Sequence, residues 1–305
     1  LPTGKTLAEE VLVPYPIESK LSGIHRYEER MWYKRQFTIP EDWSDENVLL
    51  HFGAVDWETT VYVNGEKVGD HRGGYTAFSF DITDYLVEGE NELIVHVYDP
   101  TDEGKQALGK QRLNPSGIWY TSVSGIWQTV WLEPVPEASI SDLDTVPDIN
   151  EEVLNVTVHG TGVTSETVDV IALKDGEEVG RVSGEVGTEL QVPVPNPRLW
   201  SPDDPFLYDL KVRLKDGSQT VDEVDGYFGM REITLGEVDG ILRPLLNGEF
   251  VFQMGPLDQG YWPDGIYTAP TDEALKSDIE EAKQLGFNMI RKHVKIEPAR
   301  WYYWA

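Results

Sequence analysis

Apolar and polar residues alternate in short runs along the first part of the chain, and this pattern predicts β-strands. Residues 31–40, for example, read MWYKRQFTIP, a half-buried strand that Pro40 ends. Asn64-Gly65 lies between two such runs and is a hairpin-turn signal, because both residues tolerate positive φ. The predicted strands cover residues 31–40, 48–52, 59–63, 67–68, 78–82, 92–98 and 128–132. Short strands at this regular spacing predict a jelly-roll β-sandwich over residues 1–136.

A second set of alternating runs follows Pro134 and Pro136, which mark a domain boundary. Its predicted strands cover residues 153–158, 168–173, 190–192 and 207–214. Asp-Gly pairs at 175–176 and 216–217 supply turns between some of them. The length and pattern predict an immunoglobulin-like β-sandwich over residues 137–235, without the cysteine pair of antibody domains.

The pattern changes again near the C-terminal end, where apolar runs flank a helical segment. Residues 250–254 and 287–290 are predicted buried strands. Between them Thr271 can cap a helix whose apolar stripe is Leu275, Ile279, Ala282 and Leu285, with Gly286 at its C-terminal end. Pro298 suits the first turn of another helix. Strand, helix, strand and helix in this order predict a parallel sheet that residues 236–305 begin and do not finish.

The composition narrows the partners that the chain can have. Its 305 residues include 54 acidic and 25 basic side chains, for a net charge of −29, which argues against nucleic acid or an anionic membrane as a partner. With no cysteine, disulfides and thiolate sites are excluded. The 10 Trp and 14 Tyr residues pack well in β-sandwich cores, and their flat faces also suit sugar rings.

Sequence motifs for cofactors and metals are missing as well. The chain has no nucleotide-binding glycine pattern and no serine-nucleophile elbow, and none of its 6 histidines pairs with another at metal-ligand spacing. We therefore expect no cofactor and no metal. No signal segment opens the chain, which favours a cytoplasmic location, although Leu1 in place of methionine leaves the native N-terminus open.

Four residues near the C-terminal end are the candidate substrate-binding residues. In βα units, functional side chains follow the carboxyl ends of the strands. Asp258 and Trp262 follow the first predicted strand, and Arg291 and His293 follow the second. The alternative is structural: Arg291 forms an ion pair with Glu297, and Trp262 covers the rim of the sheet. For the other five histidines a structural or surface role is the simpler interpretation.

The chain resembles glycoside hydrolase family 2, the group of β-galactosidases, β-glucuronidases and β-mannosidases. The resemblance rests on VYVNGEKVGDHRGGYTAFSFDIT (61–83), SGIWQTVWLE (124–133), FGMRE (228–232), LNG (246–248) and GFNMIR (286–291), in the order of that family. It implies a jelly-roll sugar-binding-type domain, an immunoglobulin-like domain and the start of a (β/α)₈ TIM barrel.

The resemblance also implies a retaining β-glycosidase that acts with two glutamates, an acid/base and a nucleophile, on a β-glycoside. In the family these follow the fourth and the seventh barrel strand, whereas only two strands are predicted here. No catalytic residue is therefore assigned, and the 305-residue chain alone is expected to be inactive. Residues 255–259 (GPLDQ) depart from the family's Gly-x-Asn-x-His, and Gly117 stands where galactosidases have an aspartate, so no sugar is named.

A second interpretation is a non-catalytic carbohydrate-binding β-sandwich protein, in which the jelly roll itself binds sugar. Both interpretations have a carbohydrate as partner, and both leave homo-oligomerisation open.

Overall fold

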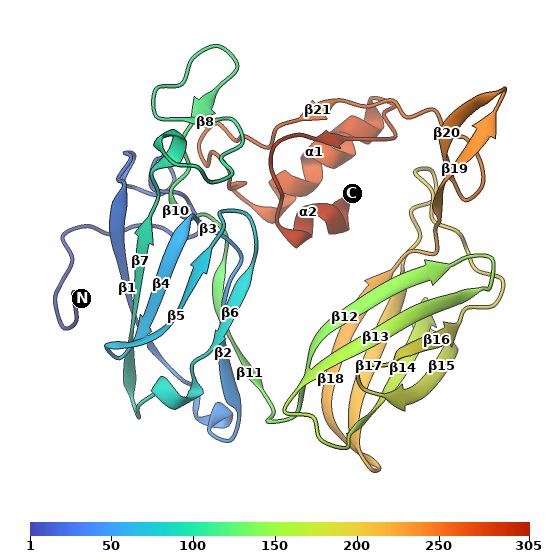
Figure 1. Ribbon diagram of the computed structural model, residues 1–305, viewed down its shortest axis with the longest axis horizontal. Helices are drawn as coiled ribbons and strands as arrows, with labels where there is room; N and C mark the ends of the chain where they lie inside the picture. Colours follow the sequence, from blue (N-terminus) through green and yellow to red (C-terminus); the bar gives the residue numbers. More distant parts are fainter. The chain divides into compact units, whose positions relative to one another are not determined.

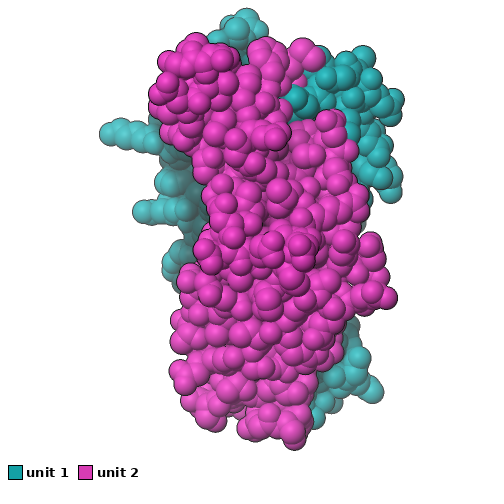
Figure 2. All heavy atoms as spheres, turned by 90° about the vertical axis from the view of Figure 1, so that its right-hand side faces the viewer, with its two compact units in different colours: residues 1–134, 255–305 teal, residues 135–254 magenta.

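The computed structural model describes residues 1–305, and the fold is mainly β (Figure 1). The chain forms two compact units, residues 1–134 with 255–305, and residues 135–254 (Figure 2). The sequence predicts a different division, into three domains of residues 1–136, 137–235 and 236–305. This division stays a prediction.

The first unit is built on a β-sandwich of two antiparallel sheets. One sheet has the order β1-β7-β4-β5, and the other the order β11-β2-β6. Their bounds are β1 Arg30–Thr38, β2 Asn47–Phe52, β4 Glu58–Val63, β5 Glu66–Arg72, β6 Phe78–Asp81, β7 Glu90–Tyr98 and β11 Val130–Val135. Two short pairs join β3 (Val55–Asp56) to β10 (Gly125–Ile126) and β8 (Gln111–Arg112) to β9 (Tyr120–Thr121). Single 3₁₀ turns lie at Glu41–Trp43, Thr83–Tyr85 and Thr101–Glu103.

Buried and half-exposed residues alternate strictly along strands such as β4, and the buried ones lie in the core of this sandwich. In β4 every second residue, Thr59, Val61 and Val63, is fully buried, while the residues between them are half-exposed. The buried side chains of both sheets meet in one apolar cluster. Asn64 and Gly65 have φ of 51° and 86°, so the hairpin predicted at this pair is confirmed.

The second unit is a β-sandwich of its own with sheets β12-β13-β16 and β15-β14-β17-β18, followed by the hairpin β19-β20. The bounds are β12 Ser139–Asp148, β13 Val153–Thr161, β14 Thr167–Lys174, β15 Glu177–Glu185, β16 Glu189–Pro193, β17 Tyr208–Asp216, β18 Gln219–Phe228, β19 Ile233–Val238 and β20 Ile241–Leu246. Strands β12, β15, β18, β19 and β20 have no counterpart among the predicted strands. Three of them, β12, β15 and β18, contain a register shift, so their apolar residues recur at irregular spacing instead of every second residue.

The C-terminal segment, residues 255–305, contains a small βαβ unit. Strands β21 (Leu257–Asp258) and β22 (Arg291–Lys292) are parallel, and α1 (Asp272–Gln284) connects them, followed by α2 (Ala299–Trp304). The predicted helix is confirmed: the Thr271 side chain accepts a hydrogen bond from the backbone N–H of Ala274. Leu285 is the exception on its stripe, because it is 76% exposed.

The two buried strands predicted near the C-terminal end are wrong, because the observed strands lie at other residues. Residues 250–254 and 287–290 form no strand, and Phe252 is 70% exposed. A strand needs a hydrogen-bonding neighbour, and pairing occurs only where Leu257–Asp258 meets Arg291–Lys292. The C-terminal segment thus contains one short parallel pair, β21-β22, and the TIM barrel is not confirmed by it.

No helix of the chain combines the length and apolarity that crossing a membrane requires.

Candidate functional site

The predicted site lies at the carboxyl ends of β21 and β22. The backbone N–H of Arg291 donates to the carbonyl of Pro256 (3.0 Å), and that of His293 donates to the carbonyl of Asp258 (2.8 Å). This register sets Asp258 beside Lys292. Their side chains form an ion pair, with 2.6 Å between Lys292 Nζ and the Asp258 carboxylate.

The Asp258–Lys292 pair belongs to a buried network of four charges. Lys292 also contacts Glu297 at 2.6 Å, and Lys295 contacts the same Glu297 oxygen at 3.1 Å. The side chains of Lys295 and Glu297 are almost completely buried, and that of Lys292 is 11% exposed. Two ammonium groups therefore face two carboxylates, so the network is neutral and its members compensate one another's loss of water.

Lys295 is the most enclosed member of this network. Its Nζ donates to the backbone carbonyls of Gly260 (2.7 Å) and Tyr267 (2.8 Å). It also lies over the aromatic rings of Tyr267 and Trp127, 4.6 and 5.5 Å from their centroids. Burial lowers the pKa of Lys295 to about 8, partly offset by Glu297. The ammonium form thus remains the main one at pH 7, held by acceptors on every side.

Trp127 and Tyr267 connect this network to the jelly roll. Thr268 Oγ1 donates to the carbonyl of Trp127 (2.6 Å), and Trp127 Nε1 donates to the carbonyl of Gly74 (2.7 Å). The Tyr267 hydroxyl meets the hydroxyls of Tyr75 (3.2 Å) and Tyr261 (3.3 Å). Residues far apart in the chain thereby form one aromatic and polar core between the sandwich and the C-terminal segment.

Three buried carboxyl groups lie on the jelly-roll side of this core. Burial raises the pKa of Glu18 to about 8, although Glu18 accepts hydrogen bonds from Ser122 Oγ (3.1 Å) and the Ser124 amide (3.0 Å). Burial also raises the pKa of Asp56 and of Asp99. At neutral pH Glu18 is therefore mainly protonated.

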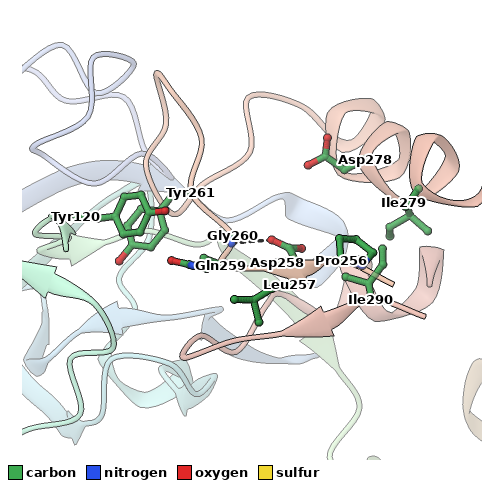
Figure 3. A pocket seen from close by; sticks show the side chains of 11 residues that line it. Tyr120, Pro256, Leu257, Asp258, Gln259, Gly260, Tyr261, Asp278, Ile279 and Ile290 are labelled. Atoms are coloured by element: carbon green, nitrogen blue, oxygen red, sulfur yellow. Dashed lines mark hydrogen bonds between the residues drawn. The ribbon is translucent and has the colours of Figure 1, made fainter. Parts of the chain in front are cut away.

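A pocket of about 350 Å³ opens beside β21 and α1 (Figure 3). Figure 3 shows Tyr120 and Tyr261 at one end and Asp278 and Ile279 of α1 at the other. The two tyrosine rings stack at 3.8 Å between centroids and 13° between planes. The amide oxygen of Gln259, on the pocket wall, is buried and has no hydrogen-bond partner. A stacked aromatic wall together with the carboxylates of Asp258 and Asp278 suits a polyhydroxylated ligand, whose hydroxyl groups donate hydrogen bonds.

The structure brings two of the four predicted site residues together. Asp258 lines this pocket and, with Trp262, an adjoining hollow of about 30 Å³. Arg291 is exposed and His293 half-buried, and neither of them lines the pocket or the adjoining hollow. The alternative ion pair between Arg291 and Glu297 is wrong, because successive strand residues point to opposite faces and Lys292 takes that place. The substrate-binding role of all four stays a prediction.

Sequence reasoning missed part of the set of residues that builds the site. Lys292 gave no motif signal, and Tyr120 and Tyr261, which stack on each other, lie more than a hundred residues apart in the chain. The available signal was local: Arg291 and Lys292 are successive strand residues and therefore point to opposite faces of β22. No three His, Asp or Glu side chains converge as a metal site.

Replacing Lys295 with methionine should lower the free energy of unfolding by about 3 kcal/mol, because two carbonyls and a buried carboxylate lose a charged donor. Chemical denaturation followed by tryptophan fluorescence measures the change. The matched control is Arg26→Met, which breaks an exposed ion pair with Glu9 and should leave stability unchanged. Equal effects of the two substitutions would contradict a stabilising role for the buried network.

The raised pKa of Glu18 makes stability depend on pH with a defined sign. An acid whose folded pKa is raised stabilises the fold fully below its unfolded pKa of 4.5, and this contribution is lost as the pH rises through about 8. The loss over this interval is about 5 kcal/mol, at about 1.4 kcal/mol per pH unit. Denaturation at pH 5 to 9 should show a smaller slope for Glu18→Gln than for the unsubstituted chain. The exposed Glu10→Gln should keep the full slope, and an unchanged slope in Glu18→Gln would refute the assignment.

Known proteins resemble this chain along most of its length. Residues 7–136 match the family model "Glycosyl hydrolases family 2, sugar binding domain", and residues 138–231 match "Glycosyl hydrolases family 2". A β-galactosidase of Thermoanaerobacter pseudethanolicus is 29% identical over 297 residues, which are 92% of this chain and 39% of that protein. A putative β-glucuronidase of Formosa agariphila is 29% identical over 85% of this chain and 31% of its own length.

The fold is shared with solved structures. The β-glucuronidase of Ruminococcus gnavus superposes with a TM-score of 0.82 at 24% sequence identity, over 96% of this chain and 51% of that one. The chain thus spans 31% to 51% of the length of these relatives. With both of its β-sandwiches matched by models of one family, the chain belongs to glycoside hydrolase family 2.

Proposed function

We propose that this chain is the amino-terminal part of a retaining β-glycosidase. The observation that carries the proposal is the order of its parts: two β-sandwiches matched by family 2 models, followed by the parallel unit β21-α1-β22. Several relatives are β-galactosidases or β-glucuronidases, of which the chain spans a minor share. In this proposal β21 and β22 are the first two strands of a (β/α)₈ barrel.

The chain supplies one edge of the active site in this proposal. Active sites of such barrels lie at the carboxyl ends of the strands, where Asp258 and His293 are found. Asp258 and Trp262 face the pockets, and the exposed guanidinium of Arg291 has no ion-pair partner. These groups and His293 bind and orient the sugar, whereas bond cleavage requires two further carboxyl groups.

Glu297 does not fit either catalytic role. A retaining glycosidase places two carboxyl groups about 5–5.5 Å apart around the scissile bond, with access to the sugar. The side chain of Glu297 is buried and paired with Lys292 and Lys295, so a sugar has no free access to it. The acid/base and the nucleophile are therefore assigned to polypeptide beyond residue 305, and the sugar and the oligomeric state stay open. A cytoplasmic location likewise remains a prediction.

The purified 305-residue chain should not hydrolyse nitrophenyl β-glycosides, because it lacks both catalytic carboxyl groups. The polypeptide encoded by the complete gene should hydrolyse at least one of the β-galactoside, β-glucuronide and β-mannoside. Release of nitrophenol measures both. Turnover by the 305-residue chain, or inactivity of the longer polypeptide towards the whole panel, would contradict the proposal.

In the active longer polypeptide, Arg291→Ala and His293→Ala should each lower kcat/KM at least about 10-fold, because each loses a contact to the sugar. Lys283→Ala on the exposed face of α1 is the matched control and should leave kcat/KM unchanged. Wild-type kcat/KM in both site variants would remove these residues from the substrate edge.

A further inference from the structure

The strands of the sheet β1-β7-β4-β5 can be followed in Figure 1. Their register places aromatic and charged side chains in rows on the outer face of this sheet. Alternation directs Val61 and Val95 into the core, so their neighbours in sequence point outward. The register aligns the outward residues across strands: Arg30, Tyr98, Glu58 and Arg72 form one row, and Trp32, His96, Thr60 and Asp70 form the next. Successive rows lie about 7 Å apart along the strands.

Trp32 is the centre of this face. It is 40% exposed, although its ring contacts His96 at 4.5 Å and Tyr62 at 6.4 Å between centroids. Strand β1 and these two rings therefore hold the indole in place while leaving much of it open to solvent. A fixed, exposed indole on a sheet loses little side-chain entropy when a ligand stacks on it.

The amino-terminal segment closes one end of the face. The Gly4 amide donates to the carboxylate of Glu92, and Lys34 Nζ donates to the carbonyl of Lys5 (2.9 Å). Ile94, whose position in the alternation is outward, is fully buried there. The open part is consequently the pair of rows that contain Trp32 and Tyr98.

Charges in the two open rows are balanced, unlike those of the whole chain, because Arg30 and Arg72 are matched by Glu58 and Asp70. Glu58 pairs with Arg72 at 3.1 Å, Asp70 with Lys67 at 2.5 Å, and Lys34 with Glu92. Arg30 lies 3.9 Å over the ring of Tyr98. Burial lowers the pKa of His96, which favours its neutral form. On a chain of net charge −29, this locally neutral surface suits an uncharged ligand better than an anion or a basic protein.

We propose that this face binds a neutral, β-linked polysaccharide chain, with one sugar ring stacked on Trp32. The apolar C–H face of a pyranose packs on an aromatic ring, and its hydroxyl groups exchange hydrogen bonds with neighbouring polar side chains. Thr60, hydrogen-bonded to Asp70 at 2.8 Å, and His96 supply such groups in the row of Trp32. The β-linkage rests on the proposed glycosidase function, whereas binding itself does not require hydrolysis.

The jelly roll offers a matched control on its other sheet. Trp131 of β11 is 44% exposed and stacks on His51 at 4.8 Å, so it equals Trp32 in exposure and in aromatic support. The surroundings of Trp131 differ from those of Trp32 in their polar groups, because the His51 ring beside Trp131 is already bonded to Ser79 and Glu133. A nonspecific affinity of exposed tryptophan for polysaccharide would affect both positions equally.

The test is affinity electrophoresis of the 305-residue chain in gels containing β-1,4-galactan, β-1,4-glucomannan, mixed-linkage β-glucan or the anionic polygalacturonate. At least one neutral polysaccharide should retard the chain, and Trp32→Ala should weaken that retardation at least about 10-fold, while Trp131→Ala should not. Circular dichroism and thermal unfolding verify that both variants are folded. Thr60→Val, which removes a hydroxyl beside the Trp32 ring and leaves the ring in place, should weaken binding by a smaller factor.

Three results would overturn the proposal. These are no retardation by any neutral polysaccharide, retardation by polygalacturonate alone, and equal losses in Trp32→Ala and Trp131→Ala. Each is independent of the nitrophenyl glycoside assay, so failure of the binding face and failure of the proposed hydrolase function are distinguishable.

Discussion

The buried ammonium group of Lys295 is the interaction on which the C-terminal segment depends. Strands β21 and β22 pair over two residues each, which is too little to hold a βαβ unit together. Lys295 adds bonds to the carbonyls of Gly260 and Tyr267 and an ion pair with Glu297. Because an uncompensated ammonium is costly in this interior, the loops that supply these acceptors are held in one arrangement.

The contacts of Lys295 also connect the jelly roll to the C-terminal segment. Trp127 and Tyr267, which lie under Lys295, come from the jelly roll and from the C-terminal segment respectively. The pocket wall repeats the pattern, with Tyr120 from one part stacked on Tyr261 from the other. A substrate in this pocket would contact both parts, so the sugar-binding-type domain contributes to the walls of the site in addition to its own core.

Much of the fold could be predicted from the sequence, because alternation and turn residues are local signals. Asn64-Gly65, Thr271 and Gly286 each fix a turn or a helix end by their own chemistry, and all three are found as predicted. Strands β12 and β15 were not predicted, because register shifts in them break the alternation of apolar and polar residues. The apolar run at residues 250–254 was wrongly predicted to be a strand. A strand also requires a hydrogen-bonding neighbour, which the sequence pattern does not reveal.

The candidate site was less predictable because its contacts also depend on which strands become neighbours. Asp258 was identified by its place after a strand, but its partner Lys292 depends on the register between two strands. Glu297 was paired with Arg291 on sequence proximity, whereas the faces of β22 pair it with Lys292. Glu18 and Asp56 gave no signal at all, because their raised pKa values come from burial by residues distant in the chain.

The central claim is that this chain forms the edge of a glycosidase site whose catalytic carboxyl groups lie beyond it. Labelling the complete gene product with an activated 2-deoxy-2-fluoro-β-glycoside, followed by peptide mapping, tests this claim most directly, because the trapped intermediate marks the nucleophile. We predict one labelled glutamate, outside residues 1–305. A label on Glu297, or on any other carboxylate of these 305 residues, would contradict the account.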